Sequence, residues 1–302
     1  MQVADLKKYI PEISNSTSIE EINKGFSNDK KFLVTNKNTK LLLRVSNIKE
    51  FQSKLNEYNT LKKLHQYSVR SSKPISIGLQ QELEICYMLL SYIEGEDGEE
   101  ILPKYSREEQ FKIGLEAGRE LKKMHNLEAD SSISNWYERK SLKNKKYIEA
   151  YKNCGIKIKN EDKIIAFIEE NEKYLKKRPN TFQHDDFHPA NIIIKNKHYA
   201  GTIDFNRYDW GDPIHDFCKV ALFGRSVSVP FSIGQIQGYF NSENIPEEFW
   251  RLYALYAAMS IFSSIIWTIG HDPKGLPAML ENLCLILEDH KYFEKLKPQW
   301  YD

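Results

Sequence analysis

The sequence lacks the features that mark secreted, nucleic-acid-binding or repetitive proteins. Its 302 residues include 43 basic and 42 acidic side chains, so the formal net charge is only +1. A chain with no excess of one charge has no overall field that attracts nucleic acid or a membrane surface. The N-terminal residues MQVADLKKYIPEI contain acids and no long apolar core, unlike a signal peptide. We therefore expect a cytoplasmic protein without nucleic acid or membrane partners.

Cysteine is also scarce. The chain has four cysteines, Cys86, Cys154, Cys218 and Cys284, which are far apart and form no Cys-x-x-Cys pair. Zinc sites and disulfide frameworks depend on closely spaced or regularly spaced cysteines. The pattern instead indicates reduced thiols, as is usual in the cytosol.

One apolar run without charged residues could be mistaken for a membrane span, LYALYAAMSIFSSIIWTIG at residues 252–270. It approaches the length of a membrane span. Its Ser, Thr and Tyr side chains, and the lack of a second such run, favour a buried helix in a helical domain over a membrane-spanning helix. Residues 138–178 are rich in lysine, but interspersed acids dilute the charge, and we interpret them as solvated helix faces.

The first third of the chain is typical of an antiparallel sheet. After a short amphipathic helix that ends near Pro11, β-prone runs at residues 22–26, 31–35 and 41–45 alternate with polar turns. Residues 84–93 form a nearly continuous apolar run, and the sequence beyond them is largely helical, including a predicted helix at 107–127. This change of composition predicts a hinge near residues 90–96, which separates an N-terminal lobe of residues 1–93 from a C-terminal lobe of residues 94–302.

Two features of the predicted sheet suit phosphate binding. Gly25, Ser27 and Asn28 lie in the first turn and could present backbone N–H groups to a phosphate, although an ordinary hairpin turn is the alternative. Arg44 interrupts the apolar run LLLRV and needs a partner if it is buried. Glu57 lies on the flank of the helix predicted at 48–67, and such a cation and acid can pair beside a phosphate site. A snorkelling arginine and a solvated glutamate are the alternative.

The stretch at residues 182–217, FQHDDFHPANIIIKNKHYAGTIDFNRYDWGDPIHDF, carries the strongest signal of chemistry. Asp186 is followed by Asn191, an apolar run, a turn and a second run that ends at Asp204. Two carboxylates and an amide supply the base and the oxygen ligands of magnesium-dependent phosphoryl transfer. The alternative is that Asp186 and Asp204 only cap turns after strands. The residues predict a kinase of a small hydroxyl compound.

These motifs resemble a known family. His184-x-Asp186-x-x-x-x-Asn191, then Ile203-Asp204 and Gly211-Asp212-Pro213-x-x-Asp216, are similar to the aminoglycoside phosphotransferase and choline kinase-like family, and the resemblance covers roughly residues 20–290. It implies an α+β, bilobal protein-kinase-like fold with an antiparallel-sheet N-lobe and a mainly helical C-lobe. One departure is Asp185, which stands where the family commonly has Gly and adds a second carboxylate beside Asp186. Repulsion between the two carboxylates could raise a pKa or be relieved by a nearby cation.

The resemblance implies a role for each matching residue. It makes Asp186 the catalytic carboxylate, Asn191 and Asp204 the Mg²⁺ ligands, and His184 a structural residue of the catalytic loop. The GDPxxD spacing of Asp212 and Asp216 fits a helix cap and an internal brace, with substrate contact as the alternative. The implied cofactors are ATP and Mg²⁺. The nucleotide would be bound by a larger set, which comprises the phosphate-covering loop, the cation and its partner, and the adenine-contacting hinge: Ser27, Asn28, Arg44, Glu57, Ser91, Tyr92 and Ile93.

The acceptor is less defined by the sequence. We expect a small, cationic hydroxyl compound, with an aminoglycoside as the first candidate, which would make the protein an antibiotic-resistance kinase. Acids could provide a complementary pocket, among them Asp185, Asp209, Glu281 and Glu288. Alternatively, Tyr208, Trp210 and Trp267 could form a cation–π box for choline or a related amine. A metabolic kinase of choline, ethanolamine, homoserine or a sugar amine, and a non-catalytic nucleotide-binding scaffold, remain alternatives, and the oligomeric state is open.

Overall fold

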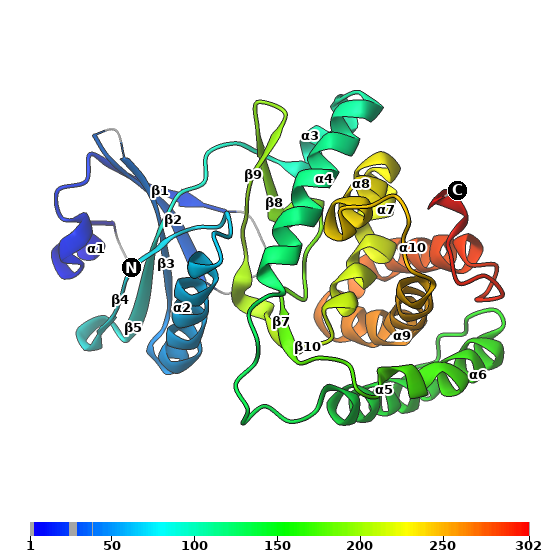
Figure 1. Cartoon of the computed structure of the whole chain (residues 1–302). Coiled ribbons are helices and arrows are strands. Elements are labelled where there is room, and N and C mark those ends of the chain that lie inside the picture. The colour runs from blue at the N-terminus through cyan, green and yellow to red at the C-terminus, as the bar shows by residue number, and fades with distance from the viewer. Residues whose placement is uncertain (1–2, 24–28, 38, 302) are drawn as a thin grey trace. The chain divides into compact units, whose positions relative to one another are not determined.

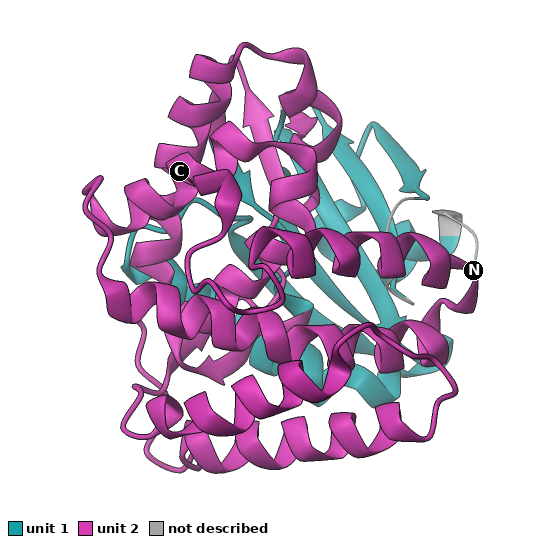
Figure 2. Cartoon of the chain, turned by 90° about the vertical axis from the view of Figure 1, so that its right-hand side faces the viewer, with its two compact units in different colours: residues 1–95, 200–206 teal, residues 96–199, 207–302 magenta. Residues whose placement is uncertain are grey.

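The structure, a computed structural model, describes residues 3–23, 29–37 and 39–301 (Figure 1). The chain divides into two compact units, which Figure 2 shows in different colours. Unit 1 comprises residues 1–95 and 200–206, and unit 2 comprises residues 96–199 and 207–302. Our predicted lobes were residues 1–93 and 94–302. The segment 200–206, which includes Asp204, thus groups with the N-terminal residues, although it is distant from them in sequence.

Unit 1 is built on a five-stranded antiparallel sheet with the strand order β1-β2-β3-β5-β4. Two helices, α1 and α2, accompany it (Figure 1). Its elements are α1 (Val3–Tyr9), β1 (Ser18–Ile22), β2 (Lys30–Asn36), β3 (Thr39–Asn47), α2 (Phe51–Gln66), β4 (Pro74–Gln80) and β5 (Ile85–Ser91), with 3-10 turns η1 (Pro11–Ile13), η2 (Ile48–Glu50) and η3 (Gln81–Leu83).

The two faces of this sheet have different roles. Phe32 pairs with Leu43, which in turn pairs with Leu89, and these side chains form a buried cluster with Leu6 and Ile10 of the N-terminal segment. Successive side chains of a strand point to opposite faces. The residues that alternate with this cluster, such as Lys31 and Arg44, therefore share the other face, from which the candidate site is built.

Two strands of unit 1 differ from our predictions. The first strand was predicted at residues 22–26, but β1 ends at Ile22, and residues 24–28 lie outside the described part of the chain. β1 buries no side chain fully and is defined by its ladder to β2, which composition does not reveal. β4 was not predicted, because Gly78 interrupts its apolar pattern. A Cβ at Gly78 would lie 2.6 Å from the ring of Tyr87, so a larger residue at this position would require the Tyr87 ring to shift.

Unit 2 is mainly helical. Its long helices are α4 (Arg107–Met124), α5 (Trp136–Lys152), α6 (Glu161–Asn171), α8 (Val229–Phe240), α9 (Glu247–His271) and α10 (Leu276–Asp289), and its short ones are α3 (Gly98–Ile101) and α7 (Arg225–Val227). A capping box defines the start of α4: Ser106 Oγ accepts a hydrogen bond from Glu109 N at 3.2 Å, and Glu109 Oε2 accepts one from Ser106 N at 2.9 Å. The helix predicted at 107–127 is thus confirmed.

Helices α4 and α8 pack backbone against backbone. Each contributes two glycines four residues apart, Gly114 and Gly118 in α4, and Gly234 and Gly238 in α8. A Cβ at Gly118 would overlap the carbonyl oxygen of Gln235. Small residues at this spacing allow two helices to approach closely. This pair carries His125 at the end of α4 and Tyr239 in α8, which support the catalytic region described below.

Helix α9 corresponds to the long apolar run. Among the described residues it is the one helix with the length and composition to cross a membrane, and 72% of its most apolar 18-residue window is buried inside the protein. It packs against α5, α6 and α10. This burial agrees with the predicted core helix.

Short strands and turns carry the predicted catalytic stretch. β7 (Thr181–Gln183) pairs with β10 (Asp209–Gly211), and β8 (Ile192–Lys195) lies between β6 (Glu96–Asp97) and β9 (His198–Thr202). The turns are η6 (Pro189–Asn191), η7 (Phe205–Arg207), η8 (Pro213–Phe217) and the π-helical η9 (Val220–Gly224), with η4 (Leu102–Lys104), η5 (Glu172–Leu175), η10 (Pro273–Gly275) and η11 (Gln299–Tyr301) elsewhere.

Candidate active site

The segment between β7 and β8, residues 184–191, is called the catalytic loop below. It brings Asp186 and Asn191 together: Asn191 Nδ2 donates to the backbone oxygen of Asp186 at 2.9 Å and to its Oδ2 at 3.2 Å. The other carboxylate oxygen, Oδ1, faces His188 Nε2 at 3.4 Å and Lys219 Nζ at 3.3 Å. The carboxylate of Asp186 is therefore fixed by one amide and two potential cations.

These partners keep Asp186 ionised. Burial raises its pKa, but the hydrogen bond from His188 and the charge of Lys219 more than offset that effect, so the pKa lies well below the usual range. A carboxylate with such a low pKa is a weak base in the ground state. It can orient a hydroxyl group as a hydrogen-bond acceptor without removing the proton in advance.

Asp216 fixes the backbone of the catalytic loop by hydrogen bonds. It is fully buried and accepts hydrogen bonds from the backbone N–H groups of His184 (2.9 Å) and Asp185 (2.7 Å). His125 Nε2 lies 3.0 Å from the same carboxylate, and His125 Nδ1 lies 2.9 Å from the hydroxyl of Tyr239. This chain links the loop to the α4–α8 pair, so Asp216 has the geometry of the brace that we predicted.

Asp212 has the geometry of the predicted cap. Its Oδ1 accepts from Ile214 N at 3.1 Å at the start of η8. The fully buried carboxylate is also paired with Arg178 at 2.8 Å and accepts from the hydroxyl of Tyr256 at 2.7 Å. With all its partners inside the fold, Asp212 serves the structure of this region.

Asp185 has a backbone reason to replace glycine. Its φ is +58°, in the left-handed region that suits Gly and, among other residues, Asn and Asp. Its carboxylate lies 3.2 Å from His215 Nδ1, and Lys140 Nζ lies 2.7 Å from Nε2 of the same ring. Burial raises the pKa of Asp185, yet His215, Lys219 and Lys140 together hold it below the usual range. The second carboxylate is thus relieved by cations, one of the two outcomes that we considered.

The pKa values of Lys140 and His215 are lowered, whereas the pKa of Lys219 is raised. Burial lowers the pKa of Lys140 to about 8 and, with the nearby charge of Lys140, lowers the pKa of His215. A neutral His215 can accept from Lys140 at Nε2 and present Nδ1–H to Asp185. For Lys219, burial acts in the same way, but Asp186 and Asp185 outweigh it and raise the pKa.

The residues expected to recognise a cationic acceptor have partners within the chain. Asp209 is paired with Arg139 at 3.1 Å. Tyr208 and Trp210 lie edge to face, with ring centres 6.0 Å apart, whereas Trp267 stacks on His271 and has the Arg207 guanidinium 5.1 Å from its ring. The contacts of Trp267 are thus different from those of the other two rings. These contacts therefore do not join Tyr208, Trp210 and Trp267 into a single aromatic box.

In unit 1, Arg44 is paired with Glu57, and the two side chains are only 4% and 3% exposed. A second buried acid, Asp29, was not predicted: it accepts from Arg44 Nε at 2.9 Å and NH2 at 2.6 Å, from Ser46 Oγ at 2.6 Å and from Lys54 Nζ at 2.8 Å. Burial raises the pKa of Asp29, but Arg44 and Lys54 lower it to about 2. The cation predicted for phosphate is therefore held by two carboxylates.

Asp204, also in unit 1, has a lysine beside it. Lys31 Nζ lies 3.6 Å from Asp204 Oδ2, and Asp204 has a φ of +65°. Lys31 is the cross-strand partner of Arg44 in the β2–β3 ladder. Sequence reasoning missed Lys31, because the register of the ladder could not be read from the predicted strands: pairing 31–35 symmetrically with 41–45 would have placed Phe32 opposite Arg44, whereas the structure pairs Lys31 with Arg44.

The predicted hinge lies at the end of β5. Ser91 N donates to Lys73 O at 2.9 Å, Ser91 Oγ accepts from Lys73 N at 2.8 Å, and Tyr92 N donates to Lys40 O at 3.2 Å. Two of the three predicted hinge amides are therefore already used within unit 1, and Ile93 is the third. Ser27 and Asn28 lie outside the described residues, so their predicted role stays a prediction.

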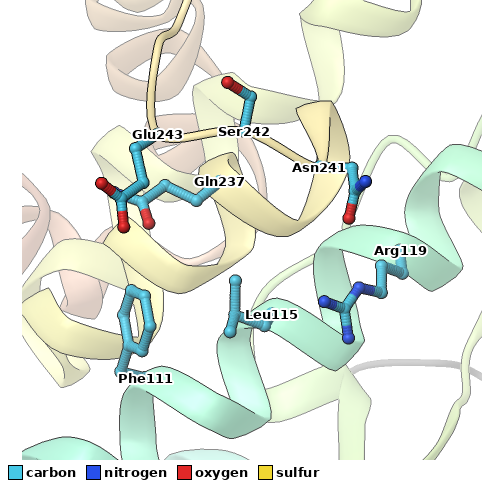
Figure 3. Close-up of a pocket in the computed structure, with 7 residues that line it drawn as sticks. All are labelled: Phe111, Leu115, Arg119, Gln237, Asn241, Ser242 and Glu243. Carbon is cyan, nitrogen blue, oxygen red and sulfur yellow. The ribbon is translucent and has the colours of Figure 1, made fainter.

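A pocket of about 220 Å³ lies between α4 and the end of α8 (Figure 3). Arg119 comes from α4 and Glu243 follows α8, and the remaining lining residues are Phe111, Leu115, Gln237, Asn241 and Ser242. None of the residues that the sequence predicts for the site lines this pocket. It is a feature separate from the catalytic loop.

The oxygen chemistry of the predicted magnesium ligands suits a hard cation. Within the described part of the chain, no group of three or more His, Cys, Asp or Glu side chains is arranged to hold a metal. Asn191, however, uses Nδ2 for both of its bonds to Asp186, and these bonds leave its carbonyl oxygen unengaged. Amide and carboxylate oxygens are the ligands that Mg²⁺ prefers.

Comparisons with known proteins agree with this picture. A family model described as the phosphotransferase enzyme family matches residues 18–254. The gentamicin complex of APH(2'')-IIa is 21% identical, with a TM-score of 0.66 over 94% of this chain and 96% of that chain. ADP-bound APH(2'')-Ib is 19% identical, with a TM-score of 0.64 over 99% of each chain.

The GDP complex of aminoglycoside 2'-phosphotransferase-IIIa is 14% identical, with a TM-score of 0.68 over 93% of this chain and 95% of that chain. A comparison with curated protein sequences gives no match. The predicted α+β, protein-kinase-like fold is confirmed by these likenesses.

Proposed function

Since the chain belongs to the phosphotransferase enzyme family, we propose that it transfers the γ-phosphoryl group of ATP to a hydroxyl group of a small molecule. One observation carries this proposal. Asp186 is an ionised carboxylate, hydrogen-bonded by Asn191, in a loop whose backbone is held by the buried Asp216. An ionised, fixed acceptor of this kind suits the orientation of a nucleophilic hydroxyl.

The step proposed for Asp186 follows from its low pKa. The acceptor hydroxyl donates a hydrogen bond to the carboxylate, and its oxygen forms the new bond to the γ-phosphorus. The bond from that phosphorus to the β-phosphate oxygen breaks, and ADP leaves with the bonding electrons. The hydroxyl proton passes to Asp186 late in the step, because the new bond to phosphorus draws electron density from the oxygen and makes this proton more acidic.

Asn191 and Asp204 are the residues that would hold magnesium in this proposal. When bound, the ion would supply positive charge that neutralises the charge developing in phosphoryl transfer. Within unit 1, Lys31 is 3.6 Å from Asp204 and adds a cation beside the predicted ligand. We propose that Lys31 and Arg44 together face the nucleotide phosphates, with Glu57 and Asp29 fixing Arg44.

The adenine base would pair with the hinge. The amides of Ser91 and Tyr92 already donate to Lys73 and Lys40, so these residues shape the hinge by holding the end of β5. Ile93 is the remaining predicted hinge residue, and we propose its backbone as the pairing partner of adenine. Ser27 and Asn28 are proposed to cover the phosphates.

An aminoglycoside is the first candidate acceptor. This choice is supported by likeness to enzymes solved with gentamicin, and by others solved with streptomycin, kanamycin or hygromycin B. Choline, ethanolamine, homoserine and sugar amines form the second candidate class. Trp267 offers that class little support, because its ring already has Arg207 over it. We further propose that the enzyme acts in the cytoplasm, without nucleic acid or membrane partners.

The test is coupled ADP release with Mg²⁺-ATP. The panel comprises gentamicin, kanamycin, streptomycin, hygromycin B, choline, ethanolamine and homoserine. Turnover with any aminoglycoside that is faster than with the amines is the expected result. Turnover with choline alone would replace the aminoglycoside proposal by the metabolic one. No turnover with any hydroxyl acceptor, despite ATP binding, would favour a nucleotide-binding scaffold.

A further inference from the structure

Lys219, which has no predicted role, contacts the carboxylate of Asp186 and acts electrostatically on Asp185. Its Nζ is 3.3 Å from Asp186 Oδ1, and the two side chains are only 16% and 19% exposed. Lys219 directly precedes η9, the π-helical turn, and its Nζ is 5.7 Å from the centre of the Phe223 ring. π-helical turns are rare and often occur at functional sites.

The two carboxylate oxygens of Asp186 have different partners. A carboxylate oxygen has two lone pairs that can accept hydrogen bonds. Oδ1 faces both Lys219 and His188, at 3.3 and 3.4 Å, whereas Oδ2 accepts from Asn191 at 3.2 Å. Among partners in the described part of the chain, Oδ1 thus faces two nitrogen atoms of potential cations, whereas Oδ2 faces the Asn191 amide.

On the premise of the proposed function, we infer that Lys219 is a positioning residue for phosphoryl transfer. With His188 it occupies Oδ1, so that the acceptor hydroxyl donates to Oδ2, the oxygen that Asn191 also contacts. The hydroxyl is then held in one orientation. Without Lys219, Oδ1 has one contact fewer and the carboxylate can rotate. The acceptor hydroxyl could then donate to either carboxylate oxygen and would no longer be held in one orientation.

A purely structural role makes a different prediction. Asp185 and Asp186 are adjacent acids, and a partly buried cation that acts on both relieves their repulsion. If Lys219 did only that, its loss would lower the stability of the protein and leave the path of the transferred phosphoryl group unchanged. Positioning, by contrast, decides whether the acceptor or water receives that group. Water attack converts ATP and water to ADP and inorganic phosphate.

The experiment compares Lys219→Met, Lys219→Arg and a control, Lys146→Met, which removes the same charge from an exposed position of α5. Each is assayed with Mg²⁺-ATP and whichever aminoglycoside or amine of the panel wild type phosphorylates. The measured quantities are kcat, the two KM values, the melting temperature, and the ADP released per phosphorylated acceptor.

For Lys219→Met we expect kcat to fall about 100-fold, because a misplaced nucleophile costs this much, with the KM for ATP within about twofold of wild type. The ratio of ADP to phosphorylated acceptor should rise above its wild-type value. Lys219→Arg should restore at least about a tenth of wild-type kcat, since it restores a donor to Oδ1. Lys146→Met should match wild type throughout.

Two results would overturn the inference. One is a Lys219→Met protein with wild-type kcat and ratio, whatever its melting temperature. The other comes from crystal structures of wild type and Lys219→Met, which need no acceptor: the carboxylate of Asp186 should leave Asn191 Nδ2 in the variant, and an unchanged carboxylate contradicts positioning. Wild type that phosphorylates no acceptor would refute the proposed function instead, and the crystal structures would still decide the role of Lys219.

Discussion

Asp185 offers a test that separates backbone strain from charge. The residue has a φ of +58° and a carboxylate 3.2 Å from His215 Nδ1, with Lys219 and Lys140 acting on it electrostatically. Asp185→Asn keeps the shape and the tolerance of positive φ but removes the charge. Asp185→Gly removes the side chain and suits the backbone, and Asp185→Ala removes it and strains the backbone.

The magnitudes follow from these differences. Loss of the charge weakens a partly buried, charge-assisted contact and should lower the free energy of unfolding by about 1–3 kcal/mol in all three variants. A left-handed conformation costs Ala roughly 1–2 kcal/mol more than Gly. We therefore expect the stability order wild type, Asn, Gly, Ala, with at least about 1 kcal/mol between the last two.

Tryptophan fluorescence during urea unfolding is a suitable assay. All five tryptophans of the chain, at positions 136, 210, 250, 267 and 300, belong to unit 2, which also contains Asp185. An Ala variant as stable as the Gly variant would refute the backbone argument. An Asn variant as stable as wild type would refute the electrostatic one.

Two further predictions concern stability. Gly118→Ala should lower the free energy of unfolding by about 1–3 kcal/mol, because its Cβ would overlap the carbonyl oxygen of Gln235. The control Gly270→Ala lies in helix α9 with open space around the new Cβ, and it should be neutral or stabilising by up to about 1 kcal/mol. Equal effects of the two substitutions in urea unfolding would contradict the packing argument. Asp29 has a pKa of about 2 against an ordinary 3.8, so its stabilisation is fully present above pH 4 and is lost as the pH falls towards 2. This loss should be about 2 kcal/mol and absent in Asp29→Asn, as measured by circular dichroism during denaturation at several pH values; an unchanged pH dependence in the variant would show that Asp29 is not the group responsible.

Local patterns were sufficient to predict much of the fold. The Ser106–Glu109 capping box and apolar spacing locate α4, and the alternating runs at 31–35 and 41–45 locate β2 and β3. β1 and β4 were missed because neither has a continuous apolar pattern. Their positions are set by ladder bonds and by the fit of Tyr87 over Gly78, which are properties of the assembled sheet.

In the candidate site too, local contacts could be predicted from the sequence, whereas contacts between distant elements could not. Asp186 and Asn191 are five residues apart, so their spacing indicated that they would meet. Asp29 and Lys54 could not be recognised, because the partners that make them important are 15 to 25 residues away on other elements. The reason for Asp185 was likewise hidden, since neither its φ nor its contact with His215 follows from neighbouring residues.

The central claim is that Asp186 orients the acceptor hydroxyl, and Asp186→Asn tests it most directly. The variant keeps the shape of the side chain and can still contact Asn191, but it has lost one acceptor oxygen and the charge. In the ADP-release assay we predict a kcat at least about 100-fold below wild type, with the KM for ATP within about twofold. An Asp186→Asn protein that keeps wild-type kcat with the same acceptor would contradict the account.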